Sequence, residues 1–206
     1  IARAAACPDK DKADLIYRMI VLGLHLKDGH RITGMLGDPV MQRMFELGRK
    51  AGNIAMRYIE IIRFQELDSG ALLALIDPEA DVLALIAPHF SNRLPLENWM
   101  IYDRRRQKAV IHPAGKGWFL VEEVDERSVL EAEMSHEEAW YGELWKCFFK
   151  TLTIEARVNQ KLQTSLIPLK YRDFMKEFQN ESLREDCEKC QNKETKQEYE
   201  KQISQE

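Results

Sequence analysis

The chain has few cysteines and no long hydrophobic run, and both absences narrow the class of protein. Its 206 residues include 4 Cys, and a chain of this length with so few is not the disulfide framework of a small secreted protein. No apolar stretch approaches the roughly 20 residues that a membrane-spanning helix needs. No secretory signal pattern opens the sequence. We therefore expect a cytoplasmic protein with reduced thiols and no membrane contact.

Recognised catalytic and metal-binding motifs are absent as well. The sequence has no phosphate-binding loop, no GxGxxG, no HExxH and no GxSxG. Cys187 and Cys190 form a lone CxxC pair, whereas a structural zinc site needs four ligands. The 5 His residues are scattered without the spacing of metal ligands. We expect no metal and no cofactor, and the sequence identifies no reaction.

Charge is spread unevenly along the chain. The formal net charge of −4 argues against a general binder of polyanions. Residues 179–206 carry 5 Lys and Arg against 8 Asp and Glu, which predicts an acidic C-terminal tail that is helical or disordered. Residues 1–178 are long enough for a single domain with its own hydrophobic core. Within that domain, residues 93–116 are locally basic.

Helices are predicted on both sides of a central region. Apolar residues at helical spacing mark Asp9–Lys27 and Val40–Met56, and Asp38 followed by proline is a typical helix start. Ser135 with Glu138 forms a capping box, which begins a long helix with a wide aromatic stripe.

Between these helices the sequence alternates extended segments with short turns. Five segments are predicted as strands: Ile59–Leu67, Leu72–Ile76, Trp99–Tyr102, Ala109–His112 and Trp118–Val124. The first two suggest a hairpin, and the short turns between the last three favour antiparallel neighbours. A short helix is predicted to begin at Asp77 and to end near Pro88. This order predicts an α+β fold, a mainly antiparallel sheet of about five strands with helices before, within and after it.

The predicted sheet carries aromatic and cationic residues that suit single-stranded nucleic acid. The aromatic residues are Trp99, Tyr102 and Trp118, and the cations are Arg93 and the turn Arg104, Arg105 and Arg106. Bases stack on exposed aromatic rings while arginines hold the phosphates. In the alternative interpretation, the aromatic rings face the core and the arginines form a solvated turn.

A second candidate surface lies in Thr153–Phe178, where polar and cationic residues alternate with apolar ones. The polar members are Arg157, Asn159, Lys161, Gln163, Tyr171 and Arg172. Arginine grips phosphates and carboxylates with two parallel bonds, so this segment could hold an anionic partner. One alternative is a helix–turn–helix closure of the domain with a solvated outer face. Another is a buried ion pair of one arginine with an acid such as Glu155, Asp173 or Glu66.

A family resemblance rests on unusual residues that recur in order along Ile61–Ile111 and Tyr141–Phe178. These residues are Arg63, Phe64 and Glu66, Asp77 and Pro78, Pro88, His89, Phe90 and Arg93, Trp99 and Asp103, and a run from Glu155 to Arg172. On these motifs the chain resembles the DUF4130 family of bacterial DNA metabolism proteins. The resemblance implies that the N-terminal part of the family domain is missing from this sequence. It also implies a role in DNA repair or modification, beside a radical-SAM iron–sulfur protein or a uracil-DNA glycosylase-like protein.

Three functional hypotheses follow. The leading one is an accessory protein of DNA metabolism that binds DNA, another nucleic acid or a repair enzyme through a basic surface. The second is a nucleotide- or DNA-modifying enzyme with Glu66, His89 or Asp103 as acid or base. The third is an adaptor for the radical-SAM protein without DNA contact. A basic groove with exposed aromatic rings would favour the first, a closed pocket with a shifted carboxylate the second, and an exposed apolar patch the third.

Overall fold

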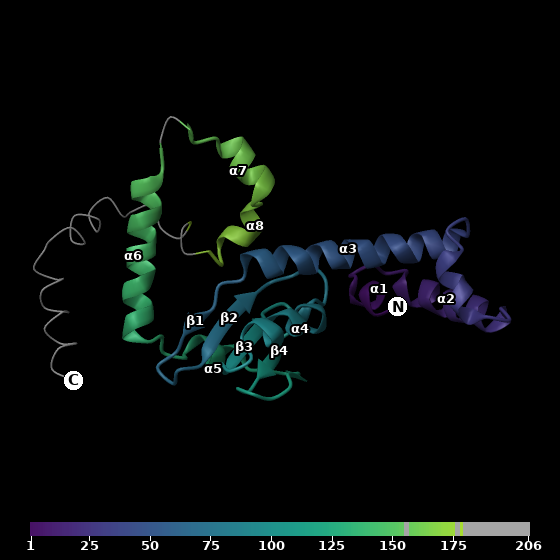
Figure 1. The fold of residues 1–206 in the computed structure, drawn as a ribbon, viewed down its shortest axis with the longest axis horizontal. Helices are drawn as coiled ribbons and strands as arrows, with labels where there is room; N and C mark the ends of the chain where they lie inside the picture. Colours follow the sequence, from purple (N-terminus) through teal and green to yellow (C-terminus); the bar gives the residue numbers. More distant parts are fainter. Residues whose placement is uncertain (155–156, 176–177, 179–206) are drawn as a thin grey trace, which may run out of the picture. The chain divides into compact units, whose positions relative to one another are not determined.

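The computed structural model describes residues 1–154, 157–175 and 178, which form helices and one sheet (Figure 1). Contacts divide the chain into two compact units. The first comprises Ile1–Gln65 and Gly70–Ala132, and the second comprises Glu66–Ser69 and the chain from Glu133 onward. The predicted acidic tail, with Cys187 and Cys190, lies outside the described residues.

The sheet has five strands in the order β1-β2-β3-β4-β5. Their bounds are β1 Gln65–Glu66, β2 Leu72–Ile76, β3 Trp99–Asp103, β4 Lys108–His112 and β5 Phe119–Val121. Strands β3, β4 and β5 pair antiparallel, as the short turns predicted, whereas β2 and β3 run parallel with Leu72 opposite Trp99. A parallel pair needs a long crossover, and helix α4 (Leu83–Arg93) provides it. The α+β prediction is confirmed, with a mixed and mostly antiparallel sheet.

The long helix α3 organises the N-terminal half of the first unit. It spans Pro39–Ile61 and packs against α1 (Ala2–Ala6), α2 (Lys12–His25) and α4. Asp38 Oδ1 accepts the backbone N–H groups of Val40 and Met41, at 2.8 and 3.2 Å, so the predicted helix start is confirmed. The remaining elements of this unit are a 3-10 helix, η1 (Gly29–Gly34), and α5 (Glu126–Leu130). None of the described helices is long and apolar enough to cross a membrane.

Two predicted boundaries are wrong. The expected strand Ile59–Leu67 is helical up to Ile61, because Tyr58 and Ile61 continue the buried stripe of α3, and burial overrides their β propensity. The expected short helix begins at Leu83 rather than Asp77 and passes through Pro88 to Arg93. Pro88 removes one hydrogen bond inside α4, and its neighbours Ile86, Ala87 and Phe90 are buried, so packing maintains the helix.

The second unit contains α6 (His136–Leu152), α7 (Gln160–Leu166) and α8 (Leu169–Arg172). The Ser135 hydroxyl accepts the N–H of Glu138 at 3.0 Å, which confirms the predicted cap of α6. The Glu138 Oε2 accepts the N–H of Glu66 at 3.4 Å, and the N–H of Ser135 donates to the Glu66 carbonyl at 2.9 Å. The start of α6 is therefore fastened to the Glu66 backbone.

Candidate functional site

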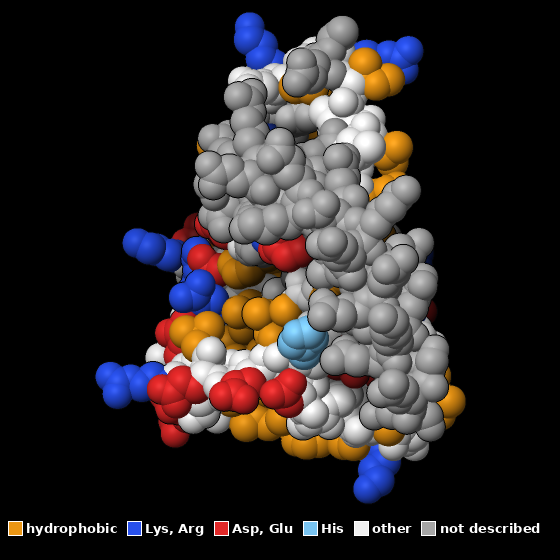
Figure 2. Space-filling view, turned by 90° about the vertical axis from the view of Figure 1, so that its left-hand side faces the viewer, with side chains coloured by type: hydrophobic (Ala, Val, Ile, Leu, Met, Phe, Trp, Pro, Cys, Tyr) orange, Lys and Arg blue, Asp and Glu red, His pale blue; other side chains and the backbone are white. Residues whose placement is uncertain are grey.

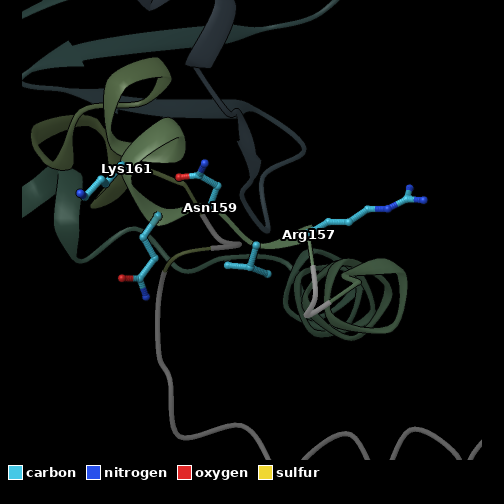
Figure 3. Close-up of a pocket in the computed structure, with 5 residues that line it drawn as sticks. Arg157, Asn159 and Lys161 are labelled. Carbon is cyan, nitrogen blue, oxygen red and sulfur yellow. The ribbon is translucent and has the colours of Figure 1, made fainter.

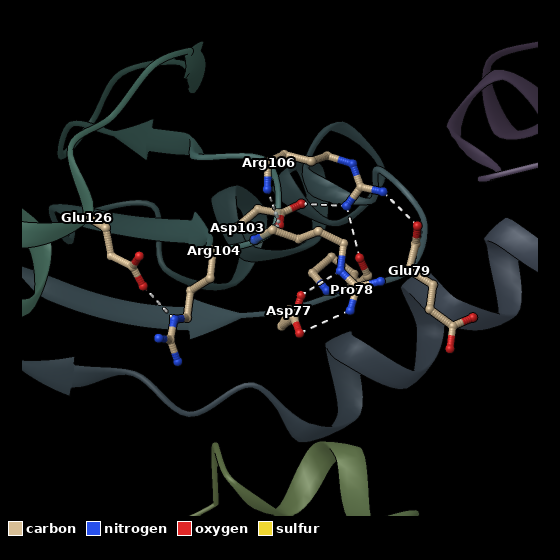
Figure 4. Close-up of polar contacts among 8 residues, drawn as sticks. Asp77, Pro78, Glu79, Asp103, Arg104, Arg106 and Glu126 are labelled. Carbon is tan, nitrogen blue, oxygen red and sulfur yellow. Dashed lines mark hydrogen bonds and ion pairs between the residues drawn. The ribbon is translucent and has the colours of Figure 1, made fainter.

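Two arginines of the turn between β3 and β4 are paired with carboxylates on the protein surface (Figure 4). Arg104 Nε lies 2.8 Å from Glu126 Oε1. Arg105 donates two bonds to Asp77, at 2.8 and 3.1 Å, in the bidentate geometry that arginine would otherwise offer to a phosphate. Both arginines would have to leave these carboxylates before holding an anionic ligand.

The third arginine of this turn forms an ion pair with a buried carboxylate. Asp103 ends β3 and is 0% exposed, and its Oδ1 accepts the N–H groups of Arg105 and Arg106 at 3.0 and 3.2 Å. Arg106 Nη1 donates to Asp103 Oδ2 and to the Pro78 carbonyl, both at 2.9 Å, and Nη2 donates to the Glu79 carbonyl at 2.6 Å. Burial raises the pKa of Asp103, and the bonds from Arg106 oppose that rise. Arg106 thereby ties β3 to the loop that follows β2.

This cluster lies at the edge where the parallel strands β2 and β3 both end. Asp77 follows β2 directly, and Asp103 pairs in register with Ile76. The carboxyl ends of parallel strands are a common place for ligands. Here, however, both carboxylates are already bound by arginines of the same unit. These bonds hold the β3–β4 turn to the loop that follows β2, and they leave neither acid free to act as a base.

The aromatic residues predicted to stack on bases are inside the protein. Trp99 is 1% exposed and Tyr102 is 0% exposed. Trp99 stacks on His112 with ring centroids 5.0 Å apart and 4° between the planes, and Phe90 meets the Trp99 ring edge-on. The expected platform is therefore wrong for Trp99 and Tyr102, and the core interpretation is correct. Trp118 is half-buried.

The proposed acid and base residues are not assembled into one site. His89 is exposed, and its ring meets Phe90 edge-on at 5.1 Å. Asp103 is bound by Arg106, and Glu66 belongs to the other unit, where its backbone fastens α6. Among the described residues, no group of three His, Cys, Asp or Glu is placed to hold a metal ion.

The Arg157–Lys161 segment forms an exposed polar surface in the second unit (Figure 3). Two adjoining shallow hollows share Gln160 and Lys161, and none of the described residues that line them is acidic. The Asn159 side chain is the cap of α7, because its Oδ1 accepts the N–H of Leu162 at 3.0 Å. Arg157 and Lys161 are exposed and make no side-chain hydrogen bond or ion pair with another described residue. The two side chains extend in different directions, so they do not converge on one small anion.

The remaining polar residues of this segment stabilise its fold. Arg172 Nε donates to the Ile167 carbonyl at 3.2 Å, and its Nη2 donates to Thr164 Oγ1 at 3.3 Å. The guanidinium also lies 4.7 Å from the centroid of the Phe178 ring. Tyr171 is 6% exposed, and Gln163 is half-buried. Arg172, the last residue of α8, thus connects that helix to the end of α7, and Tyr171 is buried rather than a surface contact. Arg93, in the first unit, is exposed.

Helix α6 exposes its large apolar side chains. Seven large apolar residues are 38% to 63% exposed: Trp140, Tyr141, Leu144, Trp145, Phe148, Phe149 and Leu152. On the other side of the helix, Gly142 is buried and the Lys146 side chain is 16% exposed. Figure 2 shows hydrophobic side chains among acidic ones on one face of the molecule. The sequence shows the aromatic stripe but gives no sign that it is uncovered.

The comparisons with known proteins place the chain in a family. A family model described as "Domain of unknown function (DUF4130)" matches residues 10–177, and the chain belongs to that family. No curated protein and no solved structure matches it.

Proposed function

We propose that this chain is an accessory protein of DNA metabolism, which binds a partner protein through the apolar face of α6. The observation that carries the proposal is the row of seven large apolar side chains, each 38% to 63% exposed, on one helix. The link to DNA metabolism rests on the resemblance described for Ile61–Ile111 and Tyr141–Phe178. The partner class that this resemblance suggests is a repair or modification enzyme, such as a radical-SAM or a uracil-DNA glycosylase-like protein.

The composition of the α6 face suits a protein partner. Tryptophan and tyrosine dominate the energetically important positions of protein interfaces, and Trp140, Tyr141 and Trp145 lie together here. An apolar helix face that stays in water carries a continuing free-energy penalty of roughly 25 cal/mol for each Å2 of apolar surface. A partner that covers the face removes this penalty. The basic turn offers less, because its three arginines are already paired.

A site-specific crosslink tests this proposal in the full chain inside cells. A photoreactive amino acid replaces Phe148, at the centre of the apolar face, and in a matched control replaces Glu143 on the opposite side of α6. We expect Phe148 to capture a defined DNA repair or modification enzyme and Glu143 to capture none. Adducts confined to this chain itself, or the same products from both positions, would contradict the proposal.

A second candidate function is binding of single-stranded nucleic acid at the Arg157–Lys161 surface. It is favoured by the two exposed cations, which lie beside hollows whose described lining residues include no acid. Each phosphate contact releases counterions, so Arg157→Ala and Lys161→Ala should each lower the salt slope of binding by about one. Fluorescence anisotropy with a labelled DNA strand measures that slope. Arg104→Ala is the matched control, because Arg104 is paired with Glu126 and should leave the slope unchanged. A wild-type protein that does not bind at about 50 mM salt excludes this function.

A further inference from the structure

A cavity of about 720 Å3 opens in the first unit between α1, α2, η1 and α3. Its apolar lining includes four methionines together with Phe45 and Leu85: Met19, Met41, Met44 and Met56. Ligand pockets have volumes of roughly 300–1,000 Å3 and are lined mainly by hydrophobic side chains. Methionine is flexible and polarisable, so a wall of methionines adapts to ligands of different shape. The size and lining therefore suit an apolar group.

The same cavity has a cationic and carboxylate-free polar side. Arg3 and Arg49 contribute guanidinium groups, and Thr33 and Asn53 contribute neutral polar groups. No acidic residue is among the described residues that line it. A pocket with two positive charges and no negative one attracts an anion.

Arg49 differs from the other arginines of α3. Arg43 lies 2.8 Å from Glu46, and Arg57 lies 3.2 Å from Glu60, so both are neutralised on the helix surface. Arg49 makes no side-chain hydrogen bond or ion pair with another described residue. Two arginines of this helix are thus paired with carboxylates, whereas Arg49, which faces the cavity, has no such partner among the described residues.

Arg3 lies beside two glycines of α3, and all three residues line the cavity. A Cβ atom at Gly52 would lie 3.7 Å from Arg3 Nη1, and one at Gly48 would lie 3.8 Å from Arg3 Cβ. Both are ordinary van der Waals distances, so the side chain of Arg3 lies next to Gly48 and Gly52 on α3. Like Arg49, it makes no side-chain hydrogen bond or ion pair with another described residue.

We propose that this cavity binds an amphipathic anion, with an apolar tail on the methionine wall and a carboxylate or phosphate head at Arg3 and Arg49. Both heads accept two parallel hydrogen bonds from a guanidinium, and such charge-assisted bonds are the strong ones. An unpaired arginine beside an apolar wall is the chemistry that distinguishes this ligand from a purely apolar one. The site is independent of the α6 face and of the Arg157–Lys161 surface.

Methionine methyl NMR locates the ligand directly. The probes are decanoate, decyl phosphate and decanol, added to the full chain labelled with 13C at its 8 Met methyl groups. We expect decanoate or decyl phosphate to shift the signals of Met19, Met41, Met44 and Met56. The signals of Met35, Met100, Met134 and Met175, which do not line the cavity, should stay in place. The anion that binds with the higher affinity identifies the preferred head group. Equal binding of decanol, or shifts spread over all eight methyl groups, would overturn the proposal.

Single substitutions assign the head-group contacts. A hydrogen bond to a charged group contributes about 1.5–3 kcal/mol, so Arg49→Gln should weaken anion binding roughly tenfold to a hundredfold. Arg3→Gln should act in the same direction. Lys50→Gln is the matched control, because Lys50 is the next residue along α3, is exposed and does not line the cavity. The methyl spectrum without ligand verifies that each variant is folded. Loss of affinity in Lys50→Gln equal to that in Arg49→Gln would show a general charge effect and refute the site.

Discussion

The three arginines of the β3–β4 turn are adjacent in sequence, yet we expect their replacement by alanine to have very different effects. Arg106→Ala leaves the Asp103 carboxylate, which is 0% exposed, without its charged partner and frees the carbonyls of Pro78 and Glu79. Removal of one partner of a buried pair costs roughly 3–5 kcal/mol. For a chain of this size that corresponds to a fall in melting temperature of about 6–20 °C.

The neighbouring arginine provides the matched control. Arg105 and Asp77 have side chains that are 49% and 41% exposed, and pairs of this kind contribute about 0–1 kcal/mol. Arg105→Ala should therefore lower the free energy of unfolding by less than about 1 kcal/mol. Both variants remove one positive charge, so a difference between them reports burial and not net charge.

Urea unfolding followed by circular dichroism measures both effects. The double variant Asp103→Asn with Arg106→Ala completes a thermodynamic cycle, and its coupling energy isolates the pair. We expect Asp103→Asn to recover part of the stability lost in Arg106→Ala, because the unpaired buried charge is removed. Equal losses of unfolding free energy in Arg105→Ala and Arg106→Ala, or no coupling energy in the cycle, would refute the stabilising role of the Asp103–Arg106 pair.

Three further predictions concern single residues. Burial raises the pKa of Asp103 above its ordinary value of 3.8, so between 3.8 and the raised value the folded protein keeps a proton that the unfolded chain loses. The contribution of Asp103 to the free energy of unfolding should therefore fall as pH rises through that window, and NMR titration of its carboxyl carbon should give a midpoint above 3.8. Asp38→Ala removes the cap of α3 and should cost about 1 kcal/mol in urea unfolding, whereas Asp38→Asn should retain most of the stability. Arg172→Ala breaks the bonds to α7 and should destabilise the chain by about 1 kcal/mol, whereas Arg157→Ala should change stability by less than about 0.5 kcal/mol in the same assay.

The features that sequence predicts well here are those that depend on neighbouring residues. Asp38 with its proline and Ser135 with Glu138 both cap helices as expected. The last three strands and their antiparallel pairing follow from short turns. In each case the hydrogen bonds that decide the structure join residues a few positions apart.

The position of Trp99 depends instead on the layers around β3. A strand with one solvated face alternates buried and exposed residues, but β3 buries Trp99, Ile101, Tyr102 and Asp103. Sequence alternation therefore gives no indication that Trp99 and Tyr102 are both inside. The Asp103–Arg106 pair does have a local signal, because Asp commonly begins a turn by accepting the next N–H groups. That signal places the carboxylate in the turn, and only the packing shows that it is buried.

Helices α3 and α6 show why an amphipathic pattern predicts a surface that needs cover but not the molecule that covers it. In α3 the stripe that includes Met44, Leu47 and Ala51 is buried, and the helix packs against α1, α2 and α4. In α6 a comparably regular stripe that includes Trp145 and Phe148 stays exposed. The two patterns have the same spacing, so the sequence predicts an apolar face that needs cover for both helices. The difference lies in what covers each stripe, and a crosslink from Phe148 measures that directly. Capture of another protein identifies the cover of α6 as a partner. Capture of this chain identifies the cover as the chain's own surface.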